Sequence, residues 1–412
     1  MDIAYKSVLD YLHVQLPMFQ RQGAAAYKSD LSRTEHLLEA VGNPQKKFKS
    51  VHVAGTNGKG SVTSALAAIF THCGYKTGLY TSPHLFDFRE RIRIEGRKVD
   101  KDFVVDFVNR VRGATDVLPS FFEITTAMAF SWFAKQKVDI AVVETGLGGR
   151  LDSTNVILPE LSVITSISFD HQAFLGNSLT EIAREKGGII KPGRPVVIGE
   201  NPVDVQNVLV AIARDRNSEA STVTATSPGL DTDLGGDYQA ENMRIVRSAV
   251  EVMRSLGWSL PEEGVIAGAK RVLELSGIRG RWEVVSRSPL VVADAAHNEA
   301  GIRKAVAMIG KERYEHLHVV WGMVSDKDSA SILALLPASA RYYWAKPDVP
   351  RGKPAEVMEA EGRAAGLIGS IHTSVHAALA AAQAAAAPND MIYIGGSLFV
   401  LAEALNPGSL AD

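Results

Sequence analysis

Residues 51–61 read Val-His-Val-Ala-Gly-Thr-Asn-Gly-Lys-Gly-Ser, a β-branched run that leads into a glycine-rich loop. The loop carries one lysine, Lys59, and ends at the hydroxyl of Ser61, after which residues 61–72 have a helical pattern. The backbone N–H groups of such a loop, together with the positive end of the following helix, form a cradle for phosphate groups. Lys59 would add a point charge for the β- and γ-phosphates. The stretch therefore predicts a protein that uses ATP or GTP.

The match to the general phosphate-loop pattern G-x-x-x-x-G-K-[ST] is incomplete. Val53 stands where the pattern has its first glycine, and Gly60 stands where it has serine or threonine. The alternative is a glycine-rich turn between a strand and a helix, with no ligand. The strand before the loop, the helix after it and the lysine within it favour the phosphate site.

The composition is that of an ordinary globular protein. The chain has 412 residues, enough for two or three domains, and 46 % of them are hydrophobic and 22 % charged. The formal net charge is −2, so no global charge favours nucleic acid or a membrane surface as a partner. The single cysteine, Cys73, excludes an intramolecular disulfide and suits the cytoplasm, which is the expected location. Residues 1–6 lack the layout of a signal peptide, and no uninterrupted apolar run could span a bilayer.

Short apolar runs alternate with helical patterns, which predicts an α/β fold with a mostly parallel sheet. In such sheets ligands gather at the carboxyl ends of the strands, so the polar residues after each run are candidates for a site. These are Gly55–Ser61, Ser82–His84, Glu144 and Asp170–His171. The predicted strands of this first series are 51–54, 77–81, 139–144, 161–169 and 195–199.

A second series of strands and helices follows a change in composition. Residues 216–236 are rich in Ser, Thr, Asp and Gly and are expected to form a surface loop. The alanine-rich stretch 376–387 is typical of a helix that packs closely on a sheet. We expect the domain boundary within 280–288, and the predicted strands of the second series are 289–293, 316–321, 341–345 and 391–395.

Two residues at the ends of predicted strands, a glutamate and a histidine, are candidate metal ligands. Glu144 ends the run 139–144, where a carboxylate beside a phosphate loop is well placed for Mg²⁺, which prefers oxygen ligands and contacts substrate phosphates. The alternative for Glu144 is a helix cap or a salt-bridged surface residue. His171 follows the run 161–169 in the same way, and its alternative is a structural histidine.

Lys186 lies on the apolar face of a predicted helix. Ser178 and Glu181 form a capping box at its start, and Leu179 and Ile182 share a face with Lys186. Burial lowers the pKa of a lysine, and a neutral amine reacts with CO₂ to give a carbamate, an anionic oxygen ligand for a metal. The alternative is a lysine whose ammonium extends to water.

The loop at Gly55–Ser61 resembles that of the Mur ligase superfamily. Further segments, in the same order along the chain, resemble its folate branch, the folylpolyglutamate synthases and dihydrofolate synthases. The resemblance covers nearly the whole chain. The segments are Thr81-Ser-Pro-His-Leu85, Glu90-Arg-Ile-Arg-Ile94, Phe122-Glu123, Glu144-Thr-Gly-Leu-Gly-Gly-Arg150, Asp152-Ser-Thr-Asn155, Asp170-His171, Leu175-Gly176, Ile182-Ala-Arg-Glu-Lys186 and Asp294-Ala-Ala-His-Asn298.

The resemblance implies an ATP-dependent ligase that joins L-glutamate to a carboxylate through an acyl phosphate and releases ADP and phosphate. Its fold would be a P-loop-type ATPase domain at 1–283 that binds ATP and folate, followed by a smaller Rossmann-like α/β domain at 284–412 that binds glutamate. The acceptor would be dihydropteroate, a reduced folate, or both. A monomer with ATP and two Mg²⁺ ions is expected, with neither nucleic acid nor a membrane as a partner.

The resemblance also implies roles for individual residues. Lys59, Lys186, His171 and His297 would be catalytic, with Lys186 carbamylated, and Mg²⁺ would be bound by Ser82, Glu144, His171 and Lys186. ATP would contact Gly55, Thr56, Asn57, Gly58, Lys59, Gly60, Ser61, Asn242, Arg281 and Asp294. The substrates would contact Thr81, Pro83, His84, Arg91, Phe122 and Glu123 on the pterin side, and His297 and Ser397 on the glutamate side. Asp152 would be a further substrate residue.

Structural roles stay open for four of these residues. Arg281 could form an interdomain salt bridge, Asp294 and Ser397 could cap helices, and His297 could lie on the surface of a helix. Two other functions also stay open. One is a Mur ligase with a different acceptor such as a UDP-sugar, and the other is a nucleotide-binding module without ligase activity.

Overall fold

The computed structural model describes residues 3–16, 30–114, 119–325 and 328–406. Within these residues helices alternate with strands along most of the chain, and the strands assemble into two separate sheets. The predicted α/β class is confirmed.

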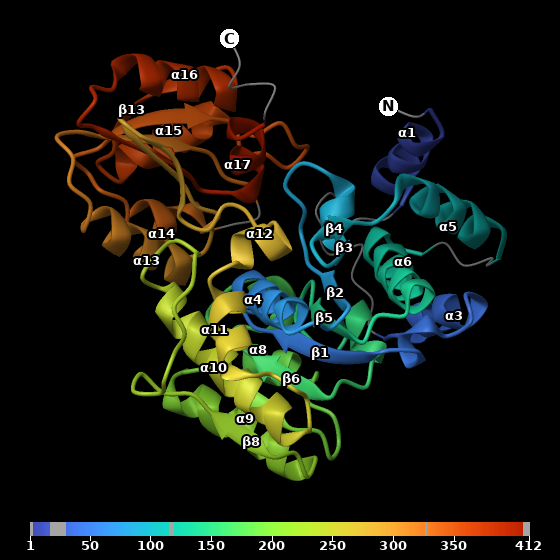
Figure 1. Cartoon of the computed structure of the whole chain (residues 1–412). Helices are drawn as coiled ribbons and strands as arrows, with labels where there is room; N and C mark the ends of the chain where they lie inside the picture. The colour runs from blue at the N-terminus through green and yellow to red at the C-terminus, as the bar shows by residue number, and fades with distance from the viewer. Residues whose placement is uncertain (1–2, 17–29, 115–118, 326–327, 407–412) are drawn as a thin grey trace. The chain divides into compact units, whose positions relative to one another are not determined.

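The chain divides into two compact units (Figure 1). The first comprises Met1–Asp233 and Gln239–Ile278, and the second comprises Leu234–Tyr238 and Arg279–Asp412. The chain thus enters the second unit briefly, returns to the first and then enters the second again. Sequence reasoning placed a single boundary at 283/284 and had no signal for the short inserted segment.

The first sheet has eight strands in the described residues, in the order β4-β3-β2-β5-β1-β6-β7-β8. Neighbours from β2 to β8 in this order pair in parallel, whereas β3 and β4 form an antiparallel addition at one edge. β1 lies in the middle with five of its six residues buried, because helices cover both faces of such a sheet. The strands are β1 (Lys49–Ala54), β2 (Thr77–Tyr80), β3 (Ile92–Ile94), β4 (Arg97–Lys98), β5 (Ile140–Glu144), β6 (Leu161–Ile164), β7 (Val196–Ile198) and β8 (Ala220–Thr222).

Three features of this sheet differ from the prediction. β6 ends at Ile164 rather than at residue 169, because residues 165–168 leave the sheet and bond to the phosphate loop. β8 lies inside the stretch predicted as a surface loop, and its partly exposed side chains give no hydrophobic pattern. The β3–β4 hairpin escaped detection because strands of three and two residues are too short to show a period.

Helix α4 (Lys59–His72) follows β1 and the phosphate loop and is buried along most of its length. Helices α10 (Gln239–Ser255), α11 (Glu262–Ala269) and α12 (Val272–Ser276) pack against it. A Cβ atom at Gly268 of α11 would lie 2.8 Å from the Cα atom of Ile69, so α11 and α4 approach closely. No helix in the described part of the chain is both long and apolar enough to cross a membrane. The other helices of this unit are α1 (Ile3–Asp10), η1 (Tyr11–Gln15, a π-helix), α3 (Ser32–Ala40), η3 (Pro44–Lys46), η4 (Phe88–Arg91), α5 (Lys101–Ala114), α6 (Phe121–Gln136), η5 (Ser153–Val156), α7 (Gln172–Leu175), α8 (Leu179–Gly187) and α9 (Val203–Asp215).

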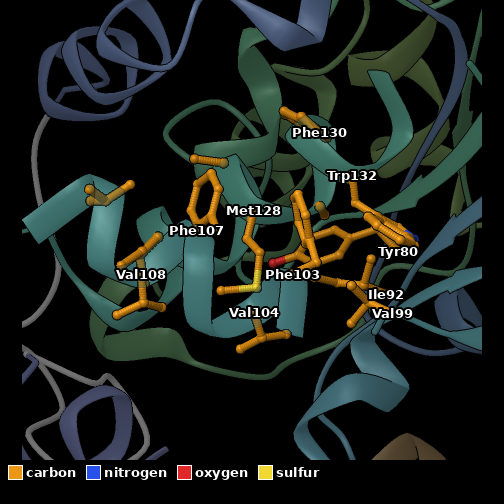
Figure 2. Packing of buried hydrophobic residues seen from close by; sticks show 14 of the residues in the cluster. Tyr80, Ile92, Val99, Phe103, Val104, Phe107, Val108, Met128, Phe130 and Trp132 are labelled. Carbon is orange, nitrogen blue, oxygen red and sulfur yellow. The ribbon is translucent and has the colours of Figure 1, made fainter. Parts of the chain in front are cut away.

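Part of the core of the first unit is shown in Figure 2, where side chains of α5 and α6 converge with Tyr80 of β2 and Ile92 of β3. Phe103 of α5 contacts Trp132 of α6, with 4.6 Å between the ring centroids. Full burial of a side chain of this size contributes roughly 1.5–3 kcal/mol. This cluster anchors the hairpin edge of the sheet, next to the segment that follows β2.

The second unit has a six-stranded sheet in the described residues, in the order β13-β12-β11-β14-β10-β9, with only β9 antiparallel. The four strands predicted for this region are present, and the alanine-rich stretch forms α16, which packs on the sheet. The strands are β9 (Glu283–Arg287), β10 (Leu290–Ala293), β11 (Leu317–Trp321), β12 (Arg341–Ala345), β13 (Ile368–His372) and β14 (Met391–Gly395). The helices are α13 (Glu299–Ile309), α14 (Ser329–Leu333), α15 (Ala355–Ala364), α16 (Val375–Ala385) and α17 (Leu398–Ala404).

The two outermost strands of this sheet were not predicted. β9 lies where the domain boundary was expected, and β13 lies at the opposite edge. Both are largely exposed, with Val284, Val285, Ile368 and Ile371 open to solvent. Edge strands need no buried face, so neither the alternating pattern nor a continuous apolar run marks them.

Candidate active site

The phosphate loop joins β1 to α4 and contains two glycines that tolerate no side chain. Gly55 has a φ angle of 152°, and a Cβ atom there would lie 1.8 Å from Oγ1 of Thr165. Gly58 precedes α4 with a φ angle of 87°, and its Cβ atom would lie 2.3 Å from Oδ1 of Asn242. Glycine lets the backbone pass close to its neighbours in both places. The second contact places Asn242 of α10, a predicted ATP residue, beside the loop.

A segment after β6 holds the loop in place. Oγ1 of Thr165 donates to the carbonyl of Asn57 at 2.7 Å, and the N–H of Thr56 donates to the carbonyl of Ser166 at 2.7 Å. The N–H of Ser168 donates to Oγ1 of Thr56 at 3.1 Å. These bonds order the loop in advance, which reduces the entropy lost when a ligand binds.

Two lysines donate to the same carbonyl of this loop. Nζ of Lys59 lies 3.0 Å from the carbonyl oxygen of Gly55, and Nζ of Lys186 lies 2.7 Å from it. Lys186 is buried, so the alternative in which its ammonium extends to water is wrong. Burial, reinforced by the positive charge of Lys59, lowers the pKa of Lys186 to about 7. Its amine is therefore partly neutral near pH 7. Gly60 and Ser61 are buried in the first turn of α4.

Glu144 ends β5, next to the strand that leads into the loop. It pairs with Val53 in the register of β5 and β1, and it is buried rather than on the surface. Its Oε2 atom accepts a 3.1 Å hydrogen bond from the N–H of Ser82, so two of the predicted metal ligands are neighbours. Pro83, the next residue, is exposed.

His171 precedes the short helix α7 and has a left-handed backbone with a φ angle of 52°. Its N–H donates to Oδ1 of Asp170 at 2.9 Å, and its Nε2 atom lies 3.7 Å from the same oxygen. The charge of Asp170 acts on Lys186 and opposes the lowering of its pKa. The buried carboxylate of Glu144 ends β5 and the imidazole of His171 follows β6, and these two strands flank β1, which leads into the phosphate loop. A carboxylate and an imidazole form a donor set that fits a divalent cation.

Asp152 organises the glycine-rich loop after Glu144. Its Oδ2 atom accepts hydrogen bonds of 2.8 Å from the N–H groups of Gly146 and Leu147, and its Oδ1 atom accepts from the N–H and the hydroxyl of Thr154. Since the Thr154 hydroxyl donates to the carboxylate, it accepts from Nε2 of His52, 2.8 Å away. His52 is fully buried in β1 and was not predicted as part of the site. A histidine among β-branched residues in a central strand is the signal that could have found it.

Arg91 and His84, both predicted on the pterin side, are joined by a hydrogen bond. Nε of Arg91 donates to Nδ1 of His84 at 2.8 Å, and the guanidinium lies 5.0 Å from the ring centre of Phe121. Burial lowers the pKa of Arg91 to about 10, and burial next to Arg91 keeps the pKa of His84 well below its usual value. The N–H of Thr81 donates to the carbonyl of Arg91. His13 of η1 stacks on Phe121 with 5.5 Å between ring centroids, and no motif near it in sequence indicated this.

Phe122 and Glu123 are adjacent in sequence but have different roles in the structure. The ring of Phe122 covers Gly146, where a Cβ atom would lie 2.4 Å from its Cζ atom. Glu123 forms a capping box with Ser120 at the start of α6 and an ion pair of 3.5 Å with Arg33. The pattern Ser-x-x-Glu could have indicated this structural role of Glu123 in advance.

Asp294 of the second unit is bound on both oxygens by groups of the protein. Oδ2 accepts from the N–H of Trp282 at 2.8 Å and from the hydroxyl of Tyr238 at 2.7 Å, and Oδ1 accepts from the N–H of Ala296 at 2.9 Å. The suggestion that Asp294 caps a helix is wrong, because Asn298 caps α13. Asp294 instead ties the inserted segment that ends at Tyr238 to its own unit.

The remaining predicted residues of the second unit lie in loops and at a helix start. Nη1 of Arg281 donates to the carbonyl of Gly280 at 3.2 Å. His297 precedes α13, so it is not on a helix surface, and its Nδ1 atom lies 2.9 Å from the carbonyl oxygen of Ala295. Ser397 is buried and caps α17, as its structural alternative proposed.

Comparisons with known proteins show which family the chain belongs to. The Mur ligase middle domain matches residues 53–247, and the Mur ligase glutamate ligase domain matches residues 280–398. The folylpolyglutamate synthase of Lacticaseibacillus casei is 34 % identical over 395 residues, which are 87 % of this chain and 90 % of the relative.

Solved structures of folylpolyglutamate synthase/dihydrofolate synthase enzymes are also similar to this chain. The chain is similar to Escherichia coli FolC in complex with DHPP and ADP, with a TM-score of 0.85 and 28 % identity over 97 % of this chain and 96 % of that one. It is also similar to a bifunctional folylpolyglutamate synthase/dihydrofolate synthase with Mn, AMPPNP and L-glutamate bound, with a TM-score of 0.83 and 28 % identity over 97 % of both chains. The chain therefore belongs to the folylpolyglutamate synthase/dihydrofolate synthase family of Mur ligases, which are ATP-dependent, amide-forming ligases that join glutamate to folate.

Proposed function

We propose that this enzyme joins L-glutamate both to dihydropteroate and to the γ-carboxylate of a reduced folate. The observation that carries the proposal is the convergence of Lys59 and Lys186 on the carbonyl of Gly55, beside the buried carboxylate of Glu144. This site can hold a triphosphate next to a second anion. The relatives with bifunctional names support the use of both acceptors.

The acceptor carboxylate is already a nucleophile at neutral pH. Its oxygen attacks the γ-phosphorus, ADP leaves, and an acyl phosphate forms. Lys59 and the loop amides lower the repulsion between the two anions, which is the main barrier to this approach. The glutamate amine then attacks the acyl carbon, phosphate leaves, and the amide bond forms.

The ammonium of glutamate must lose a proton before it attacks, and we assign His297 as the acceptor. If Nδ1 carries the proton and donates to the carbonyl of Ala295, Nε2 holds the lone pair that can take the proton. On the glutamate side, Ser397 is assigned as a second contact. Arg281, Asp294 and Asn242 are assigned to the nucleotide.

Ser82, Glu144, His171 and a carbamylated Lys186 would hold two Mg²⁺ ions, which supply charge neutralisation for the triphosphate and the acceptor carboxylate. The neutral amine of Lys186 adds to CO₂, the N–C bond forms, and one proton is released to give the anionic carbamate. The low pKa of this lysine supports the step, because only the unprotonated amine reacts.

The pterin is assigned to the first unit, among Thr81, Pro83, His84, Arg91, Phe122, Glu123 and Asp152. Phe122 offers a partly exposed aromatic face, and the pair of Arg91 and His84 offers polar groups held in fixed positions. Glutamate is assigned to the second domain. The enzyme is proposed to be a monomer.

The test is ADP release by the purified enzyme with ATP, Mg²⁺ and L-glutamate, with dihydropteroate and tetrahydrofolate offered separately. Turnover with both acceptors is the expected result. Turnover with only one acceptor would mean that the enzyme is a synthase specific for that acceptor. Absence of glutamate-dependent turnover with either would direct the search to other carboxylate acceptors such as UDP-sugars.

A further inference from the structure

A cluster of metal-binding side chains lies at the amino-terminal edge of the second sheet. Glu315 and His316 immediately precede β11, and Asp390 immediately precedes β14, which is the parallel neighbour of β11. The proposed active-site residues Asp294 and Ser397 follow the carboxyl ends of strands in the same sheet. The cluster is therefore separate from them.

The cluster combines imidazole and carboxylate groups. Nδ1 of His316 lies 3.2 Å from Oδ1 of Asp390, and one ligand atom each of Glu315, His316 and Asp390 lie within 4.8 Å of one another. A second imidazole approaches from the same strand, because Nε2 of His318 lies 3.4 Å from Oδ2 of Asp390. His316 just before β11 and His318 within it thus lie against different oxygens of the same carboxylate.

The backbone holds these groups in fixed positions. The N–H of Met391 donates to the carbonyl of His316 at 2.9 Å, and the N–H of Glu315 donates to the carbonyl of Asn389 at 3.1 Å. Asp390 is buried and accepts from the N–H groups of His316 and Ala387. Nδ2 of Asn389 donates to Oε1 of Glu315 at 3.1 Å. The three side chains are thus presented by two segments that are bonded to each other.

We propose that Glu315, His316 and Asp390 form a binding site for a transition-metal ion of the Zn²⁺ class. For metal–ligand bonds of about 2.0–2.1 Å, two ligands of a tetrahedral ion lie about 3.3 Å apart, which matches the separation between His316 and Asp390. A mixed set of one nitrogen and two carboxylates suits Zn²⁺, whereas Mg²⁺ prefers oxygen ligands alone. Water would complete the coordination.

The residues behind the cluster support this assignment. His318 is buried, its Nε2 atom faces Asp390, and its Nδ1 atom lies 2.9 Å from the hydroxyl of Tyr343. Carboxylates that ligate metals in proteins are themselves held by hydrogen bonds to surrounding groups, and His318 is such a group for Asp390. A bound ion would link the starts of β11 and β14, which are far apart in sequence, and stabilise the second unit.

The experiment measures Zn²⁺ binding to the full-length protein by competition with a chromophoric chelator. Excess Mg²⁺ and ADP keep the phosphate-loop site occupied. The main variant is His316→Ala, whose side chain is 76 % exposed and whose loss leaves the backbone bonds intact. Glu315→Gln is the second variant, and His376→Ala, an exposed histidine of α16 outside the cluster, is the matched control.

We expect one Zn²⁺ ion to bind to the wild type and to His376→Ala with equal affinity, and about tenfold or more weaker binding to His316→Ala and Glu315→Gln. Zn²⁺ should also raise the Tm of the wild type but not that of His316→Ala, because a ligand that binds only the folded state stabilises it. Binding to His316→Ala as tight as to the wild type would overturn the proposal. So would a wild type that binds no Zn²⁺ under these conditions.

Discussion

Polar residues lie at the carboxyl edges of both sheets, but the two units use them differently. In the first unit, Lys59 and Lys186 donate to a loop carbonyl rather than to a carboxylate, and burial shifts the pKa of Lys186 far from its usual value. In the second unit, Asp294 and Ser397 accept hydrogen bonds from backbone N–H groups and hold the fold together. Polar groups at a strand end are thus not all equally available for chemistry. The predictions below test this difference.

The largest effect is expected at Lys186. We predict that Lys186→Ala abolishes glutamate-dependent ADP release, because the variant can form no carbamate. Added bicarbonate or small carboxylates should restore part of the activity by supplying an anionic oxygen ligand. Carbon-13 NMR of the wild type in labelled bicarbonate should show a carbamate signal that Lys186→Ala lacks. Full activity of Lys186→Ala would refute the carbamate hypothesis.

Lys59→Ala should lower ADP release by about 10³-fold, since it removes a positive charge at the triphosphate. Lys76→Ala, a lysine of the same unit outside the phosphate loop, is the control and should keep its activity. Both are compared in the same ADP-release assay under saturating ATP. An unchanged rate for Lys59→Ala would mean that the phosphate loop has been misinterpreted.

His52 links the fold of the first unit to pH. Burial lowers the pKa of His52 to about 3 from its usual 6.5, so the unfolded chain takes up a proton before the folded chain does. Stability should therefore fall as the pH drops from about 6.5, by up to about 3 kcal/mol at pH 4 from this group. His52→Gln, which keeps a donor for Thr154, should have a flatter profile. Urea unfolding between pH 4 and 8 measures the difference, and parallel profiles for the two proteins would contradict the prediction.

The smallest effect is expected at Ser397. Loss of a helix cap costs about 1 kcal/mol, so Ser397→Ala should increase hydrogen exchange at the N–H of Val400, the group that Ser397 caps. Ser397→Asp should restore protection, because aspartate also caps helices. The glutamate contact assigned to Ser397 predicts in addition a rise in KM for glutamate in Ser397→Ala that Ser397→Asp does not reverse. An unchanged KM would limit Ser397 to its capping role.

Most of the fold and the centre of the site could be predicted from sequence. The phosphate loop could be recognised because its glycines, lysine and hydroxyl are contiguous. Helical periodicity placed Lys186 on the apolar face of its helix but left open whether its ammonium reaches water. The contact between Lys186 and Gly55 could not be derived from pattern, because it joins residues 131 positions apart. It depends on the tertiary arrangement that brings α8 to the phosphate loop.

Other parts left no local signal. His13 stacks on Phe121 only because the chain brings η1 to α6. Asp294 was considered as a helix cap because it follows a strand, but α13 begins at Glu299, and Asn298 takes that role. Exposed edge strands such as β13 have no buried face, so their sequences lack the hydrophobic pattern by which a strand is recognised.

The return of the chain to the first unit affects how the protein is made. Helix α4, which carries the phosphate loop, is covered by α11 and α12, and these are synthesised after the segment Leu234–Tyr238, which belongs to the second unit. A nascent chain released as far as residue 233 therefore leaves the apolar surface of α4 without its cover. The first unit can be completed only when residue 278 has left the ribosome. Chaperone binding or aggregation of stalled chains should be greatest before that point.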